Sequence, residues 1–69
     1  MVLAFVGKIR RGGMIFITRL GDHRPRHVHI FKDTLEILKW DLEHNQVMEG
    51  KITKQIRKLI EELVEKGEL

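Results

Sequence analysis

The stretch HVHIFKDTLEILKWDL, residues 27–42, decides the fold because it predicts two strands joined by a tight turn. On both sides of Asp33-Thr34, apolar residues alternate with histidines or charged residues, which is the period of a half-buried strand. The Asp-Thr pair between the two runs is typical of a turn. Residues 27–32 and 35–42 are therefore expected to be neighbouring antiparallel strands.

Two further apolar, β-branched runs precede this hairpin, at residues 2–9 and 14–20. The sequence RRGG between them predicts a short hairpin connection, because glycine readily adopts the positive φ angles that such turns need. The loop GDHRPR then separates the second run from the third, with Gly21 and Pro25 as breakers. The first half of the chain thus predicts strands only.

Near residue 51 the spacing of the apolar residues changes to that of a helix. Apolar side chains recur at i, i+4, i+7, i+8, i+11 and i+12, namely Ile52, Ile56, Leu59, Ile60, Leu63 and Val64. Gly50 and Thr53 are both suitable start signals, and Gly67 is a fitting terminator. The preceding EHNQVMEG, residues 43–50, is polar and predicts a connection without regular structure.

These segments predict a single α+β domain over residues 1–69 in the order ββββα. A mostly antiparallel four-stranded sheet would carry the C-terminal helix on one face. Strict alternation assigns six apolar residues to that face: Phe16, Val28, Ile30, Leu38, Trp40 and Leu42. The opposite face, which we call the open face, is expected to mix apolar and ionisable side chains: Ile15, Ile17, Arg19, His27, His29, Phe31, Ile37, Lys39 and Asp41. Apolar side chains that one helix cannot cover indicate a partner or a ligand.

The composition narrows the class of protein. The chain contains no cysteine, which excludes disulfides and thiolate metal sites. The beginning of the chain is too short and too alternating for a signal peptide. No run approaches the roughly 20 apolar residues of a membrane helix. We therefore expect a cytoplasmic protein that does not engage a membrane.

The net charge of +3 is unevenly divided along the chain. Residues 1–32 hold seven basic side chains against one acidic, whereas residues 33–69 hold six basic against nine acidic. Such an asymmetry favours an anionic partner for the first half. A charged, solvated surface that keeps the protein soluble explains it equally well.

Three histidines lie within the ten residues HRPRHVHIFK that begin at His23. On a strand, His27 and His29 project from one face with their Cα atoms about 6.6 Å apart. This spacing suits two ligands of one metal, with His23 as a third and Asp41 or Asp22 as an oxygen donor. The neighbouring arginine and lysine side chains repel a cation, so we predict neither a metal nor another cofactor.

The same histidines are candidates for acid–base chemistry on a phosphodiester, because imidazole titrates near neutral pH. His27 and His29 would act as base and acid. Basic side chains would hold the phosphate: Arg19, Arg24, Arg26 or Lys39. The alternative without a function is a histidine pair on a half-exposed strand that bonds to neighbours or water. The residues alone do not decide between these interpretations.

The run DHRPRHVHI, followed by KWDL and by VMEG ahead of the terminal helix, resembles the bacterial and archaeal "domain of unknown function 4160" family. The hallmark of that family is a Pro-Pro-His-Val-His-Val segment after an Asx-His loop. Asp22-His23 matches the loop, Pro25 the first proline and residues 27–30 the hallmark. Gly50 matches the glycine before the helix, whereas Arg26 replaces the second proline.

Members of this family have no established biochemical activity. They are often encoded beside another small uncharacterised domain, in pairs that look like toxin–antitoxin modules. The resemblance therefore implies an interaction module that forms a homodimer or binds a small protein, with RNA or another polyanion as a further candidate. The predicted binding residues are His23, Arg24, Arg26, His27, His29 and Lys39. The alternative is a histidine-dependent ribonuclease or phosphodiesterase, or a metal-binding domain.

Overall fold

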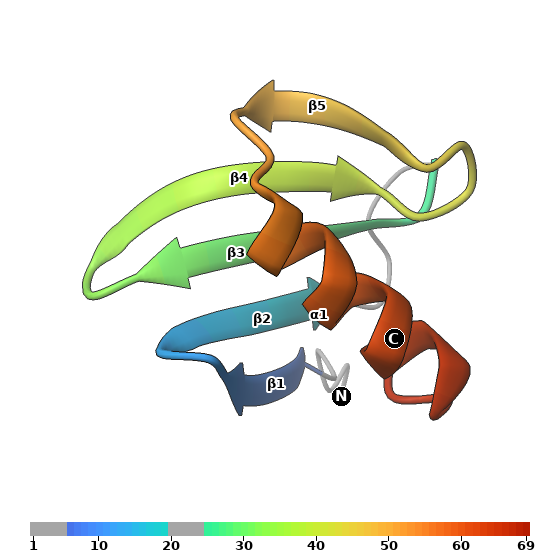
Figure 1. Cartoon of the computed structure of the whole chain (residues 1–69), viewed down its shortest axis with the longest axis horizontal. Coiled ribbons are helices and arrows are strands. Elements are labelled where there is room, and N and C mark those ends of the chain that lie inside the picture. The colour runs from blue at the N-terminus through green and yellow to red at the C-terminus, as the bar shows by residue number, and fades with distance from the viewer. Residues whose placement is uncertain (1–5, 20–24) are drawn as a thin grey trace, which may run out of the picture.

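A computed structural model describes residues 6–19 and 25–69, which form one antiparallel sheet and one helix. The elements are β1 (Val6–Arg11), β2 (Met14–Arg19), β3 (His27–Lys32), β4 (Leu35–Asp41), β5 (Gln46–Gly50) and α1 (Lys54–Glu65). The strands lie in the sheet in their order along the chain, and each adjacent pair is antiparallel. Helix α1 lies across one face of this sheet (Figure 1). The predicted α+β class is confirmed.

The prediction of four strands was wrong, because residues 46–50 form a fifth strand, β5, at the edge of the sheet. Every residue of β5 is exposed, so its sequence carries no buried alternation. Asn45 turns the chain into β5 with a φ of 51°, a conformation that asparagine tolerates better than most residues. Backbone pairing with β4 defines this strand, and the sequence pattern could not reveal it.

Tight turns join β1 to β2 and β3 to β4, where the sequence predicted them. Gly12 and Gly13 connect β1 to β2, with φ angles of 62° and 78°. Positive φ at both residues is typical of a two-residue hairpin loop. Asp33 adopts a φ of 60° between β3 and β4. Residues 2–5 and Leu20, which we assigned to strands, lie outside the described residues.

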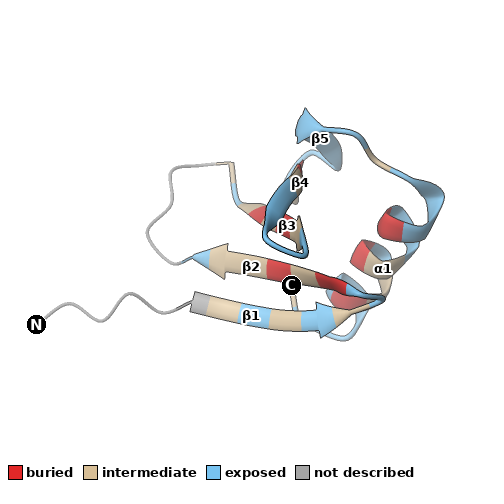
Figure 2. Ribbon diagram, turned by 90° about the vertical axis from the view of Figure 1, so that its left-hand side faces the viewer, coloured by how far each residue is buried: buried red, intermediate tan, exposed pale blue. Residues whose placement is uncertain are grey.

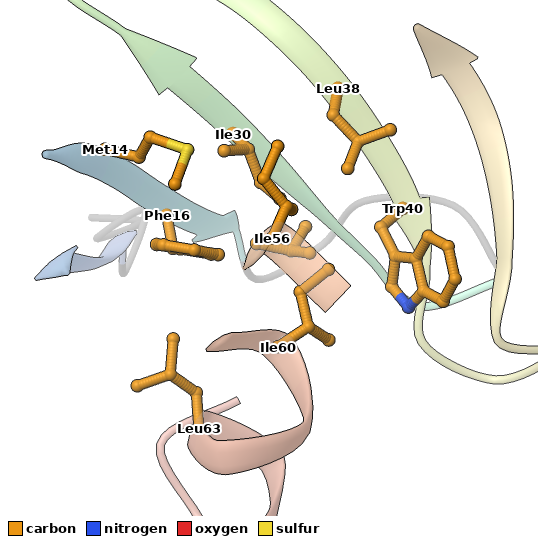
Figure 3. Close-up of a cluster of buried hydrophobic side chains, with 9 residues drawn as sticks. Met14, Phe16, Ile30, Leu38, Trp40, Ile56, Ile60 and Leu63 are labelled. Carbon is orange, nitrogen blue, oxygen red and sulfur yellow. The ribbon is translucent and has the colours of Figure 1, made fainter. Parts of the chain in front are cut away.

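The core lies between α1 and the sheet (Figure 3). It consists of Met14, Phe16, Val28, Ile30, Leu38, Trp40, Ile56, Ile60 and Leu63. Of the six core residues predicted on the sheet, five are buried, and Leu42 is half-buried against the same cluster. The alternation of β2, β3 and most of β4 therefore placed the core on the correct face.

Helix α1 begins and ends at residues with recognisable capping chemistry. It begins at Lys54, and Thr53, one of the two start signals predicted from the sequence, is its N-cap: Oγ1 of Thr53 accepts a hydrogen bond from the Ile56 amide at 3.1 Å. At the C-terminus, the amides of Gly67 and Glu68 donate to the carbonyls of Val64 and Leu63, a Schellman arrangement. No helix in the described part of the chain has the length and apolar character needed to cross a membrane.

A β-bulge interrupts the pairing of β3 with β4 and changes which side chains reach the open face. Ile30 pairs with Leu38, but Phe31 pairs with Glu36, so Ile37 is an extra residue on β4. We expected Ile37 on the open face, whereas it is half-buried and packs against the core cluster. The extra residue shifts the alternation by one, and Glu36 shares the face of Phe31 instead.

Candidate functional site on the open face

The open face is built from residues that lie directly opposite one another on adjacent strands. One row crosses all five strands, and it consists of Lys8, Ile17, His29, Lys39 and Glu49. A second row contains Arg10, Ile15, Phe31 and Glu36. Helix α1 lies on the other side of the sheet, and no other described element covers the open face (Figure 2).

The apolar part of this face is half-buried and sits among cations. Ile15, Ile17 and Phe31 are all intermediate in exposure, and they occupy neighbouring positions on β2 and β3. Lys8 and Arg10 lie beside them on β1 and are exposed. The face thus offers apolar contact area with positive charge along its β1 edge.

His27 and His29 form an edge-on pair on β3. Their ring centroids are 5.1 Å apart and the ring planes are inclined at 69°. In His27, Nδ1 donates to the backbone carbonyl of Pro25 at 2.7 Å, since a carbonyl can only accept. In His29, Nδ1 pairs with Oε1 of Glu36 at 2.6 Å, and the His29 side chain is only 12% exposed. Both Nδ1 atoms are thus engaged, which fixes the rings and makes Nε2 the basic nitrogen of each neutral ring.

Asp41, a possible metal donor in the sequence analysis, lies opposite His27 as the alternation of β4 predicted, but it is buried and organises the turn that follows β4. Its Oδ1 accepts hydrogen bonds from the amides of Glu43 and His44 at 2.8 and 3.0 Å, and its Oδ2 accepts from Nδ1 of His44 at 2.8 Å. Burial alone would raise the pKa of Asp41. The hydrogen bonds from His44 and Glu43 outweigh it and lower the pKa below its usual value.

The predicted basic residues are only partly placed. Arg26 is exposed just before β3, and its amide donates to Oε2 of Glu43 at 2.5 Å. Lys39 is half-buried and lies opposite His29, whereas Arg19 is exposed at the end of β2. His23, Arg24 and Asp22 lie outside the described residues. Among the described residues, no group of three or more histidine or acidic side chains could hold a metal ion.

Two polar residues that contact the predicted histidine and aspartate were not predicted from the sequence. Glu36 pairs with His29, but strict alternation directed Glu36 to the core side, and only the bulge at Ile37 turns it outward. His44 bonds to Asp41 from the turn after β4. The Asp41–His44 bond could have been predicted from the sequence, because Asp side chains often bond to groups two or three residues further on within a turn.

Comparison with known proteins identifies one family. The model of the family described as "Domain of unknown function (DUF4160)" matches residues 12–68, which is most of the chain. The match includes β2 to α1 and the whole stretch that carries the histidines. No curated protein and no solved structure matches this chain.

Proposed function

The chain belongs to the DUF4160 family, and we propose that it is an interaction module that binds the second protein of a toxin–antitoxin-like pair through its open face. The composition of that face supports the proposal. Half-buried Ile15, Ile17 and Phe31 lie on the side of the sheet away from α1, where no described element packs on them. Apolar side chains ringed by charged ones are the usual character of a protein-binding surface.

Binding to the protein encoded beside this chain tests the proposal. Titration calorimetry of the two purified proteins should show a saturable complex. Ile17→Asp and Lys39→Glu should each weaken it at least tenfold, because they place a charge or reverse one in the central row of the open face. Leu35→Asp is the matched control, since Leu35 is 69% exposed and lies next to the β3–β4 turn. Equal affinity for all three variants would contradict the open face as the interface.

RNA is the other occupant that the charge of this face suits. Lys8, Arg10 and Arg19 are exposed on β1 and β2 and alternate onto the open face. If RNA binds there, log affinity should fall with log salt by about 0.7 for each phosphate contacted on a single strand. Lys8→Glu with Arg10→Glu should weaken binding and flatten that slope, whereas Lys54→Glu with Lys58→Glu on α1 should do neither. Binding that ignores salt would exclude the polyanion.

A histidine-dependent ribonuclease or phosphodiesterase is the second candidate function, and the anchored histidine pair favours it. Nδ1 of His27 bonds to a carbonyl and Nδ1 of His29 bonds to a carboxylate, so both rings are held in place. Nε2 of His29 is buried, so this chemistry requires the site to open before that nitrogen meets substrate. One ring would take the proton of the 2′-hydroxyl as it attacks phosphorus, and the other would protonate the departing 5′-oxygen.

An RNA cleavage assay separates this candidate from the binding module. A ribonuclease should give a bell-shaped pH profile, and His27→Ala or His29→Ala should lower the rate at least about 10²-fold, as the loss of a general acid or base does. His44→Ala is the matched control because His44 bonds to Asp41 in the β4–β5 turn. RNA left intact by the unmodified protein at every pH would exclude the nuclease and leave the binding module.

A further inference from the structure

A groove of about 300 Å³ lies on the helix side of the molecule, between the end of β4, the β4–β5 turn and α1. Its apolar lining comes from Trp40, Ile60 and Val64. Trp40 and Ile60 belong to the buried core, but Val64 is 47% exposed. Val64 thus continues the helix stripe beyond the part that the sheet covers, and it leaves apolar surface beside the groove.

Trp40, which lines this groove, carries a hydrogen-bond donor that has no acceptor among the described residues. Trp40 is 3% exposed, and its Nε1 is buried without a hydrogen-bond partner in the described part of the chain. The close-up places the indole nitrogen on the edge of the ring nearest Ile60, which also lines the groove (Figure 3). A buried N–H without an acceptor destabilises a fold, so an acceptor that reaches it gains binding free energy.

The polar rim of the groove selects the charge of a ligand. Glu61 and Glu65 line it together with Arg57 and Asn45. Arg57 pairs with Glu61 at 3.6 Å, and both side chains are mostly exposed, at 60% and 70%. Glu65 is exposed and makes no ion pair in the described part of the chain. The rim therefore has one uncompensated carboxylate, which favours a cation over an anion.

We infer that this groove binds a short peptide segment of a partner protein in which an apolar side chain precedes a lysine or arginine. The apolar side chain packs against Val64 and Ile60, and a backbone carbonyl of the segment accepts from Nε1 of Trp40. The basic side chain pairs with Glu65. An exposed ion pair contributes little, so the Arg57–Glu61 pair on the rim opposes entry of the segment only weakly.

Other ligand classes fit the groove less well. A phosphate or free carboxylate would meet two glutamates against one arginine. A purely apolar ligand would leave the indole N–H buried without an acceptor, so the complex would still bear the free-energy cost of an unsatisfied donor. A capped peptide supplies the carbonyl, the apolar group and the cation together. The groove is separate from the open face, because α1 and the open face lie on opposite sides of the sheet.

The single tryptophan makes this binding measurable. The full chain, labelled with ¹⁵N, would be titrated with N-acetyl-leucyl-lysine amide, and its one indole N–H resonance followed by NMR. A new hydrogen bond should move that proton downfield in a saturable way. N-acetyl-leucyl-glutamate amide should bind at least about threefold more weakly, as should N-acetyl-glycyl-lysine amide, since each lacks one of the recognised groups.

Surface variants then assign the contacts without disturbing the core. Glu65→Lys should remove the preference for the lysine peptide over the glutamate peptide, and Val64→Asp should abolish the leucine contribution. Glu62→Gln is the control, because Glu62 shares the helix and lies outside the groove lining. Ile17→Asp on the open face should leave peptide binding unchanged, so that failure of this site and failure of the proposed function are distinguished.

Two results would overturn the inference. An indole resonance that does not move with up to 10 mM lysine peptide would show that no carbonyl reaches Nε1. A resonance that moves equally with all three peptides in the unmodified protein, or a lysine preference that Glu65→Lys leaves unchanged, would show that the groove does not select an apolar side chain followed by a cation.

Discussion

At the scale of single residues, Asp41 illustrates how a buried carboxylate can hold a turn together. Its two oxygens accept from two backbone amides and from the His44 ring, all within three residues along the chain. These bonds stabilise the charged form of the carboxylate and lower its pKa in the folded protein. The turn they close carries the chain from β4 into β5, so this one side chain supports the strand that the sequence pattern did not reveal.

Asp41→Asn should make the free energy of unfolding less dependent on pH in the acid range. The folded-state pKa lies below the unfolded value of about 3.9, so the carboxylate contributes stability that is fully present above that value. This contribution is lost as the pH falls through the folded pKa. The variant should be less stable at pH 7, and the difference from the unmodified protein should shrink between pH 5 and pH 2 in thermal melts. A difference in stability between Asp41→Asn and the unmodified protein that stays constant over this pH range would contradict the linkage.

Gly50 is the second residue whose identity the structure explains. It has a φ of 89°, and a Cβ atom there would clash with the carbonyl oxygen of Ile37 in the bulge of β4. The glycine therefore allows β5 to approach the bulge at the point where β5 ends. A side chain at this position would disturb both strands.

Gly50→Ala should destabilise the protein by more than about 2 kcal/mol, since the steric clash adds to the roughly 1–2 kcal/mol cost of positive φ. Gly13→Ala provides the matched control. Gly13 also has a positive φ, of 78°, but no atom lies within 4 Å of its Cβ position. Urea unfolding monitored by tryptophan fluorescence measures both. Similar losses for the two variants would mean that close packing against Ile37 is unimportant.

At the scale of elements, the sequence predicted the strands and the helix that bury an apolar face, because their apolar residues recur with the period of a strand or a helix. Val28 and Ile30 in β3 and the Ile56, Ile60 and Leu63 stripe in α1 are buried as their spacing required. Strand β5 was missed because all five of its residues are exposed. A strand held by backbone pairing alone leaves no hydrophobic period in the sequence.

The candidate site shows the same limit of sequence patterns. The sequence predicted that His27 and His29 share a face, and they lie in edge contact. It did not predict Glu36 as the partner of His29, because a bulge shifts the alternation of β4 by one residue. Bulges have no reliable sequence signal when the extra residue is apolar, as Ile37 is. The partner of a functional side chain can thus be lost even when the strand is assigned correctly.

Helix α1 offers a test of element stability at its N-terminus. Thr53→Ala removes the side-chain oxygen that accepts from the Ile56 amide, and it should lower the free energy of unfolding by about 1 kcal/mol. Thr34→Ala is the control, since Thr34 is exposed in the β3–β4 turn. Chemical denaturation followed by circular dichroism at 222 nm measures the change. If both variants lost the same amount, the cap would contribute nothing specific.

At the scale of the whole molecule, a sheet with one covered and one open face predicts association. We expect a homodimer when the partner protein is absent, because the half-buried apolar side chains of the open face would be covered by a second copy. Phe31→Glu should weaken the dimer, since Phe31 lies at the centre of the second row of that face. Sedimentation velocity from 1 to 100 μM measures this, with Leu35→Glu as the control. A monomer throughout this range would contradict the homodimer.

The order of the strands in the sheet has a consequence for how the chain reaches its fold. Because every strand pairs only with its neighbours in sequence, the sheet can be assembled by closing short loops one after another. Such a topology has a low contact order for a protein with so much sheet, and low contact order is associated with fast folding. Refolding followed by Trp40 fluorescence in a stopped-flow instrument should therefore be complete within milliseconds and fit a single exponential. A slow phase of seconds would point to a step other than strand pairing.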